Sequence, residues 1–160
     1  MPITVALSFD AVHAAAVGDL YRNVKAHPEQ YPRGMTVRIS GPWGAEEIHT
    51  CLLGEFNASN LLATAGTLAL LGMPWDQVLH QLELMQPVPG RMMRMGGDAG
   101  QPVVVIDYAH TPDALTSALQ AVRAHLDGKL VCVFGCGGNR DQGKRSQMGR
   151  AAEQLADDVF

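Results

Sequence analysis

Two short segments in the first half of the chain alternate between apolar and polar residues. The alternation runs over residues 35–40 and again over 47–52, and Gly41-Pro42-Trp43-Gly44 lies between them. A period of two places successive side chains on opposite faces of a strand, and glycine and proline are typical of turns. The pattern predicts a β-hairpin. Residues 10–24 suit a helix, but their apolar and polar positions do not separate into two faces.

Two helices are expected after the hairpin. Residues 58–71 are rich in alanine and leucine and are apolar nearly all round, which predicts a buried helix that ends at Gly72. Pro74 suits the first turn of a second helix, which extends to residue 85. The segment 86–91 then holds two prolines and a glycine. These residues interrupt regular structure, and we place a domain boundary there.

After this boundary the pattern changes to strand, helix, strand, helix. Residues 103–106 form an apolar β-branched run that predicts a strand buried on both faces, and residues 130–134 predict a second one. Helices are expected over 111–125 and 145–156, and a third strand begins near residue 158. This order is typical of an α/β protein with a parallel sheet and right-handed crossovers. Because two parallel strands make a poor domain, we expect the chain to be a fragment cut inside a fold.

The composition indicates a folded protein without nucleic-acid or membrane partners. Of the 160 residues, 47% are apolar and 18% are charged, and the net charge of −4 argues against a surface that coats nucleic acid. No apolar run approaches the ~18 residues of a membrane span, and the N-terminus lacks a signal-peptide pattern. The three cysteines are an odd number without a C-x-x-C pair, as expected for reduced thiols. We therefore expect a cytoplasmic protein.

The first candidate site is D-Y-A-H-T-P-D, residues 107–113, which follows a predicted strand and opens a predicted helix. Ligands of open α/β sheets bind at that edge, and a helix N-terminus offers N–H groups to an anion. Asp107 suits a ribose hydroxyl or a metal-bound water, and Tyr108 or His110 suits packing on a base. For residues 111–113, simple helix capping is the favoured interpretation.

The second candidate is the glycine-rich loop over residues 135–145. A dinucleotide fingerprint would need glycine where Arg140 stands, and a Walker A loop from Gly138 to Lys144 would need Ser or Thr where Arg145 stands, so we reject both. The loop still carries Asn139 and three cations, which suit a carboxylate or phosphate partner.

Two further groups carry weaker signals. Asn57 is a good helix N-cap, and Asn60 lies on the same face of the first turn, so the two amides could instead read an adenine edge. Composition alone favours the cap. His110, Cys132 and Cys136 do not match the spacing of a structural zinc site, and we expect no metal ligands here.

Four motifs in order resemble the Mur ligase family. They are G-E-F-N-A-S-N-L-L-A (54–63), P-V-P-G-R-M (87–92), D-Y-A-H-T-P-D-A-L (107–115) and G-C-G-G-N-R-D-Q-G-K-R-S-Q-M-G (135–149). The resemblance covers residues 35–160. The third and fourth motifs together favour the branch that adds a diamino acid over related ligases such as folylpolyglutamate synthetases.

The resemblance implies three domains: a UDP-binding domain, a central ATPase domain and a Rossmann-like C-terminal domain. Residues 1–86 then correspond to the C-terminal part of the central domain, 87–91 to the interdomain linker, and 92–160 to the first half of the C-terminal domain with its parallel sheet.

The implied activity depends on ATP and Mg²⁺ and serves peptidoglycan synthesis. The peptide carboxylate of UDP-MurNAc-L-Ala-D-Glu forms an acyl-phosphate with ATP. The amine of a diamino acid, expected to be meso-diaminopimelate, then displaces the phosphate. These small molecules are the implied partners.

The resemblance also implies roles for individual residues. Arg91 approaches the ribose and phosphates of ATP, and Asp107 contacts the ribose. These two residues are expected on either side of a hinge, so that domain closure brings them onto one ATP. The remaining implied contacts are Asn57 and Asn60 with adenine, Tyr108 and His110 beside the nucleotide, and Arg140 with the carboxylate of the diamino acid.

Several parts of the family pattern do not occur in this sequence. It has no G-T-x-G-K-[ST] phosphate loop, no upstream magnesium-site residues and no D-N-P-R motif, and Asn139 stands where many relatives have Asp. We therefore expect the 160 residues to be inactive alone. The alternative is a stand-alone nucleotide- or anion-binding module that uses the 135–145 loop without catalysis.

Overall fold

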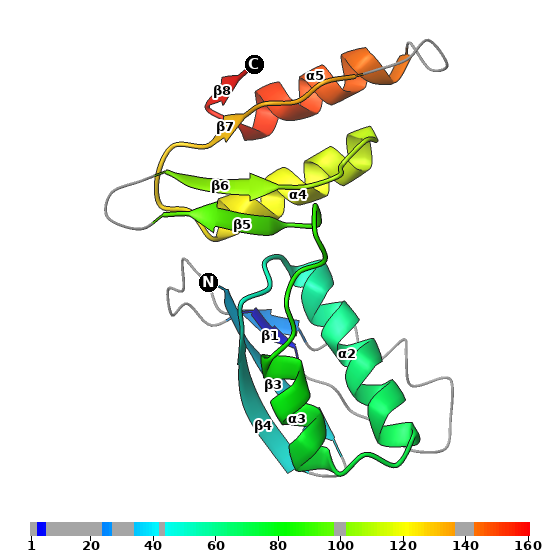
Figure 1. Cartoon of the computed structure of the whole chain (residues 1–160). Coiled ribbons are helices and arrows are strands. Elements are labelled where there is room, and N and C mark those ends of the chain that lie inside the picture. Colours follow the sequence, from blue (N-terminus) through cyan, green and yellow to red (C-terminus); the bar gives the residue numbers. More distant parts are fainter. Residues whose placement is uncertain (1–2, 6–23, 27–33, 42–43, 98–101, 137–142) are drawn as a thin grey trace. The chain divides into compact units, whose positions relative to one another are not determined.

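The computed structural model describes residues 3–5, 24–26, 34–41, 44–97, 102–136 and 143–160 (Figure 1). The chain divides into two compact units, Met1–Gln86 and Pro87–Phe160. Each unit combines helices with short strands, so the fold is mixed α/β. None of the helices in these described ranges has both the length and the apolar character needed to cross a membrane.

The first unit contains two antiparallel strand pairs. Strand β1 (Ile3–Val5) pairs with β2 (Val24–Ala26), and β3 (Met35–Gly41) pairs with β4 (Gly44–Thr50). The second pair is the predicted hairpin, which is thereby confirmed, although β4 begins three residues earlier than expected. The helix expected over residues 10–24 falls outside the described residues except at its end, where the chain is a strand.

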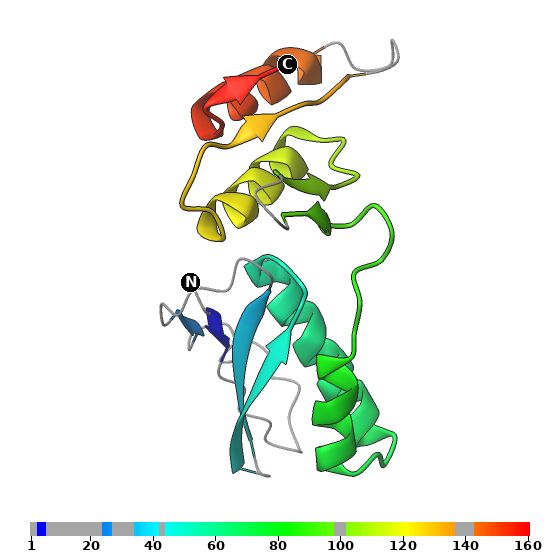
Figure 2. The ribbon, with the colours of Figure 1, turned by 60° about the vertical axis from the view of Figure 1, so that its left-hand side comes forward.

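Two helices lie side by side against one face of the β3–β4 hairpin (Figures 1 and 2). They are α2 (Glu55–Leu70) and α3 (Trp75–Glu83), close to the predicted spans. Helix α2 buries only one face, and Leu70 is 86% exposed, so the prediction of burial all round is wrong. The buried α2 residues are Ala58, Leu61, Leu62, Ala65 and Gly66.

The core of the first unit explains why these elements form. Met35, Val37 and Ile39 alternate along β3, and all three point away from solvent. Leu61 from α2 and Leu82 from α3 are 0% exposed and pack into the same core. Full burial of a leucine side chain contributes about 2 kcal/mol from the hydrophobic effect. The amphipathic pattern of strand and helices therefore stabilises this unit.

The second unit begins with a hairpin that the sequence did not predict. Strand β5 (Met93–Gly96) pairs antiparallel with β6 (Val103–Ile106). The expectation of a doubly buried strand in a parallel sheet is wrong for β6, because Val104 is 49% exposed and the strand's only ladder within the described residues is to β5. Apolar composition alone could not distinguish these arrangements.

The rest of the second unit follows the predicted order. Helix α4 (Pro112–Ala124) begins after Thr111, whose side chain accepts a hydrogen bond from the Ala114 N–H at 3.2 Å. Strand β7 (Val131–Cys132), helix α5 (Gly143–Leu155) and strand β8 (Asp158–Val159) follow. The β7–β8 pair is parallel, which confirms one parallel crossover. Residues of α4, of β7 and its entrance, and of α5 share a core: Leu115, Leu119, Leu130, Cys132, Met148 and Ala152.

Backbone contacts extend the β7–β8 ladder beyond the strand bounds. The Phe160 N–H donates to the Cys132 carbonyl at 2.9 Å, and the Phe134 N–H donates to the Phe160 carbonyl at 3.1 Å. Lys129 forms an ion pair with Asp158 at 2.5 Å. The predicted strand over residues 130–134 is therefore present in its pairing, although its regular part is shorter. The prediction that it is buried on both faces is wrong, because Val131 is 48% and Val133 77% exposed.

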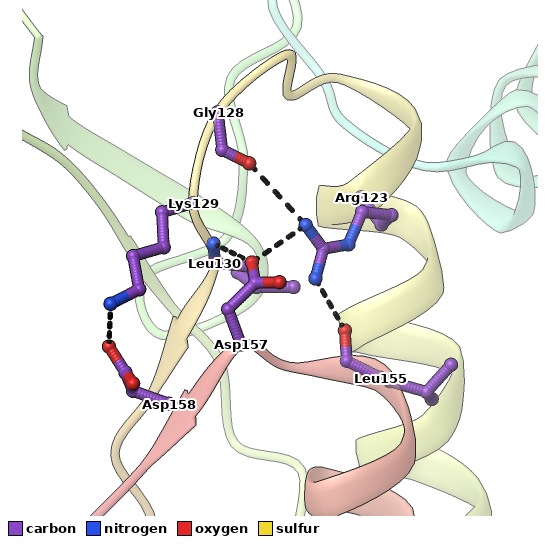
Figure 3. Close-up of polar contacts among 7 residues, drawn as sticks. All are labelled: Arg123, Gly128, Lys129, Leu130, Leu155, Asp157 and Asp158. Carbon is purple, nitrogen blue, oxygen red and sulfur yellow. Dashed lines mark hydrogen bonds and ion pairs between the residues drawn. The ribbon is translucent and has the colours of Figure 1, made fainter.

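A polar cluster ties the end of α4 to the entrance of β7 and the exit of α5 (Figure 3). Arg123 donates to the Leu155 carbonyl at 2.9 Å and to the Asp157 carboxylate at 3.0 Å. The same oxygen of Asp157 accepts the Leu130 N–H at 2.6 Å. This N–H, together with Arg123, holds the pKa of Asp157 below its usual value of 3.8. The cluster fixes the parallel strand pair to both helices.

Candidate functional site

The loop between β6 and α4 carries three of the predicted site residues. Asp107 follows β6 directly and is half-buried, whereas Tyr108 and His110 are exposed. The rings of Tyr108 and His110 lie 5.2 Å apart between centroids and are tilted by 50°. His110 Nδ1 lies 3.2 Å from the Tyr108 carbonyl. Because a carbonyl oxygen only accepts, this contact places a proton on Nδ1.

The segment before β5 brings a cation and a backbone donor to the same loop. The guanidinium carbon of Arg91 lies 5.1 Å from the centroid of the Tyr108 ring. The N–H of Met92 donates to Asp107 Oδ2 at 2.9 Å. The structure therefore brings Arg91, Asp107, Tyr108 and His110 together.

This arrangement corrects one expectation. Arg91 and Asp107 were expected on opposite sides of a hinge, to be joined by domain closure. Both belong to the unit Pro87–Phe160, and the hydrogen bond at Met92 connects their segments directly. The proline-glycine pattern located a break in regular structure correctly, but it did not show which unit the residues after the break belong to.

The beginning of α5 reaches the same loop. Lys144, in the first turn of α5, donates from Nζ to the His110 carbonyl at 3.0 Å. This contact connects the end of the glycine-rich loop to the 107–110 segment. The loop residues Asn139 and Arg140 lie outside the described residues, so the predicted contact of Arg140 with a carboxylate stays a prediction.

The two asparagines of the first motif lie in the first unit, at the start of α2. The helix begins at Glu55 after Gly54, whose φ of 89° suits glycine, and Asn57 lies within the first turn. The expectation that Asn57 is the N-cap is therefore wrong. Its Nδ2 donates to the Leu53 carbonyl at 2.9 Å, and its Oδ1 accepts from Asn60 Nδ2 at 3.0 Å. The two amides form a chain on the helix surface.

The side chains of this cluster in the second unit are suited to bind an anion and to stack on a planar ring. Arg91 and Lys144 supply positive charge, and Tyr108 and His110 supply flat ring surfaces. Phosphates pair well with guanidinium and ammonium groups, and aromatic rings stack on planar ligands. No group of three His, Cys, Asp or Glu side chains with the geometry of a metal site occurs in the described part of the chain.

Comparison with known proteins identifies the family. Residues 90–160 match the family described as "Mur ligase, glutamate ligase domain". The chain is 50% identical over 128 residues to the UDP-N-acetylmuramoyl-L-alanyl-D-glutamate–2,6-diaminopimelate ligase of Coxiella burnetii, an alignment that covers 80% of this chain and 26% of that protein. The matched segment, residues 90–160, belongs to the Mur ligase family.

A second Mur ligase relative and a solved structure agree. The ligase of the same name from Ralstonia nicotianae is 49% identical over 140 residues, covering 86% of this chain and 26% of that protein. A solved structure titled as a UDP-N-acetylmuramoyl-L-alanyl-D-glutamate–2,6-diaminopimelate ligase is 27% identical with a TM-score of 0.56, covering 98% of this chain and 36% of that one. The chain spans about a quarter of the length of the curated Mur ligases it matches.

One feature of the site was missed at the level of sequence. The anchor between Met92 and Asp107 uses a backbone N–H, and the identity of residue 92 carries no sign of it. The neighbouring prolines and glycine indicated a break in regular structure, but not the hydrogen-bond partner of residue 92.

Proposed function

We propose that the chain is part of an ATP-dependent, cytoplasmic ligase of the MurE type, which adds meso-diaminopimelate to UDP-MurNAc-L-Ala-D-Glu in peptidoglycan synthesis. The observation that carries the proposal is the 50% identity over 128 residues to a protein named for this reaction. The cluster of Arg91, Tyr108, His110 and Lys144 supports it, because charge and ring surfaces together suit a nucleotide.

The proposed reaction proceeds through an acyl-phosphate. The dipeptide carboxylate attacks the γ-phosphorus of ATP, and ADP leaves with the electron pair of the broken P–O bond. The amine of the diamino acid then attacks the acyl carbon, and phosphate leaves. Arg91 offsets negative charge on the phosphates, which is the part of such reactions where a guanidinium contributes most.

The other assigned residues bind and orient. We assign Asn60 and Asn57 to the adenine, Asp107 to the ribose end of the nucleotide, Tyr108 and His110 to positions beside it, and Arg140 to the carboxylate of the diamino acid. The first unit is assigned to the end of the central ATPase domain. We assign most ligands of the Mg²⁺ that accompanies ATP to other parts of the whole ligase.

A chimeric enzyme tests the proposal. The matched 128 residues of the Coxiella burnetii ligase are replaced by those of this chain. Formation of ADP and of the tripeptide product is then measured with UDP-MurNAc-L-Ala-D-Glu and either meso-diaminopimelate or L-lysine. We expect ligation with meso-diaminopimelate in preference to lysine. A folded chimera that forms no ADP with either amino acid would refute the proposal.

Variants of the chimera test the residue assignments. Arg91→Ala is expected to lower kcat/KM for ATP by at least about tenfold, because it removes a charged contact to the nucleotide. Arg150→Ala is the matched control, since Arg150 is an exposed arginine of α5 in the same unit. Equal activity of the two variants would remove Arg91 from the nucleotide site.

A further inference from the structure

The turn that carries Arg91 has an unusual backbone. Gly90 has φ of 74° and Met92 has φ of 46°. Glycine adopts such values freely, but a methionine does so at a cost in free energy that surrounding contacts must offset. Among the described residues, Met92 is the only non-glycine residue with positive φ. Something must therefore hold this turn in place.

Two contacts at Met92 meet that need. Its side chain is 1% exposed, and its N–H donates to Asp107 Oδ2 at 2.9 Å. The next residue, Met93, is paired with Ile106 in the β5–β6 ladder. The carboxylate of Asp107 therefore continues the ladder by one further bond and ties the turn to the end of β6.

The tied turn determines where Arg91 lies. The backbone N–H of Arg91 donates to the Val88 carbonyl at 2.9 Å, and the guanidinium carbon of Arg91 lies 5.1 Å from the Tyr108 ring centroid. Tyr108 is 64% exposed, and a cation–π contact at an exposed ring is weak. Such a contact cannot by itself keep a strained turn in place, whereas a charge-assisted hydrogen bond from a backbone N–H to a half-buried carboxylate can.

We propose that Asp107 is a positioning residue for Arg91: one carboxylate oxygen holds the 90–92 turn, so that the guanidinium lies over Tyr108 before any ligand arrives. The proposal rests on the proposed function, in which Arg91 binds the phosphates of ATP. It assigns to Asp107 an effect on nucleotide affinity that acts through Arg91, in addition to any direct contact with the ribose. A guanidinium placed in advance loses less freedom on binding, and affinity rises accordingly.

The first experiment reads the turn itself, in the ¹⁵N-labelled 160-residue chain without nucleotide. We measure hydrogen exchange of the Met92 amide and the ring-current shift of the Arg91 side-chain N–H by NMR. Asp107→Ala removes the acceptor and is expected to lose both signals. Asp107→Asn keeps an acceptor oxygen and is expected to retain both. Asp113→Ala, which removes an exposed carboxylate from the first turn of α4, is the matched control.

The same experiment can overturn the proposal. If Asp107→Ala leaves the Met92 exchange rate and the Arg91 shift unchanged, Asp107 does not position the turn. If alanine prevents folding, Asp107→Ser replaces it, because its shorter side chain cannot reach the Met92 N–H. A serine variant that keeps both signals overturns the proposal equally.

The second experiment measures ATP affinity by calorimetry in the chimeric ligase. Asp107→Ala and Arg91→Ala are each expected to weaken binding at least about tenfold. The double variant is expected to lose less than the product of the two single losses, because part of the Asp107 effect acts through Arg91. Multiplied losses of about a hundredfold would overturn the proposal, since independent contacts add in free energy.

A third result separates this proposal from the proposed function. If the NMR signals respond as expected but neither variant changes ATP affinity, the anchor of the turn stands. The assignment of Arg91 to ATP, and with it the proposed function of this site, then fails.

Discussion

Met92 permits a direct test of the strained turn before β5. Replacing a buried methionine by alanine costs about 2–5 kcal/mol, and Met92 is 1% exposed. At φ of 46° an alanine also retains a left-handed penalty of about 1–2 kcal/mol, which glycine does not have. Elsewhere alanine is more stabilising than glycine by about 0.5–1 kcal/mol. We therefore expect Met92→Gly to be at least as stable as Met92→Ala.

The matched control is Met95, a half-exposed residue of β5 whose φ is not positive. There the alanine variant is expected to be the more stable of the pair. The glycine–alanine difference at Met92 should thus shift by about 1 kcal/mol toward glycine relative to Met95. The same order and size of difference at both positions would refute the reasoning about the turn.

Urea unfolding of the full chain provides the measurement. Both tryptophans, Trp43 and Trp75, belong to the first unit, so their fluorescence does not report on the turn. Amide signals of α4 in two-dimensional NMR spectra follow the second unit instead. The tryptophan transition serves as an internal control and should be the same in all four variants.

Three further predictions concern the second unit. Thr111→Ala should lower its stability by about 1 kcal/mol, because it removes the acceptor of the Ala114 N–H, whereas Thr111→Ser should restore most of the loss. The pKa of Asp157 lies below 3.8, chiefly because its carboxylate accepts the Leu130 N–H. The ionised carboxylate therefore stabilises the fold fully above that pH, and this contribution is lost as the pH falls through the lowered pKa of the folded state. Asp157→Asn should therefore flatten the acid dependence of the thermal midpoint. Burial raises the pKa of the Cys132 thiol, so mass spectrometry should find it the last of the three cysteines to be alkylated.

Local signals in the sequence were sufficient for most helices. The Thr-Pro-Asp start of α4 was predicted and is confirmed, because capping and a proline at N1 act within one turn. The β3–β4 hairpin was predicted for a similar reason, since alternation and a Gly-Pro turn are short-range features. The start of α2 was predicted three residues late, because Asn57 resembled a cap and Gly54 did not.

Pairings between distant segments could not be obtained in this way. The Val-Val-Val-Ile run of β6 has the composition of a buried parallel strand, but it pairs antiparallel with β5 and stays partly exposed. Composition reports how apolar a strand is and not which neighbour covers it. For the same reason the apolar end of α2 at Leu70 was expected to be buried and is not.

The candidate site shows the same division. Asp107, Tyr108 and His110 were predicted together because they are close in the sequence. The contact of Arg91 with Tyr108 was not predicted. It depends on a turn with positive φ at Met92 and on the Asp107 side chain, which lies fifteen residues further along the chain and accepts the Met92 N–H. The position of Arg140 and the roles of Asn57 and Asn60 stay predictions.

The cluster around Arg123 has a consequence for how this region changes in evolution. One guanidinium serves the carbonyls of Gly128 and Leu155 and the carboxylate of Asp157. A lysine carries one compact ammonium and cannot reach three such acceptors at once, so the usual exchange of one cation for another is not neutral here. Substitutions at Arg123 and Asp157 should therefore co-vary among homologues, with both positions changing together or neither.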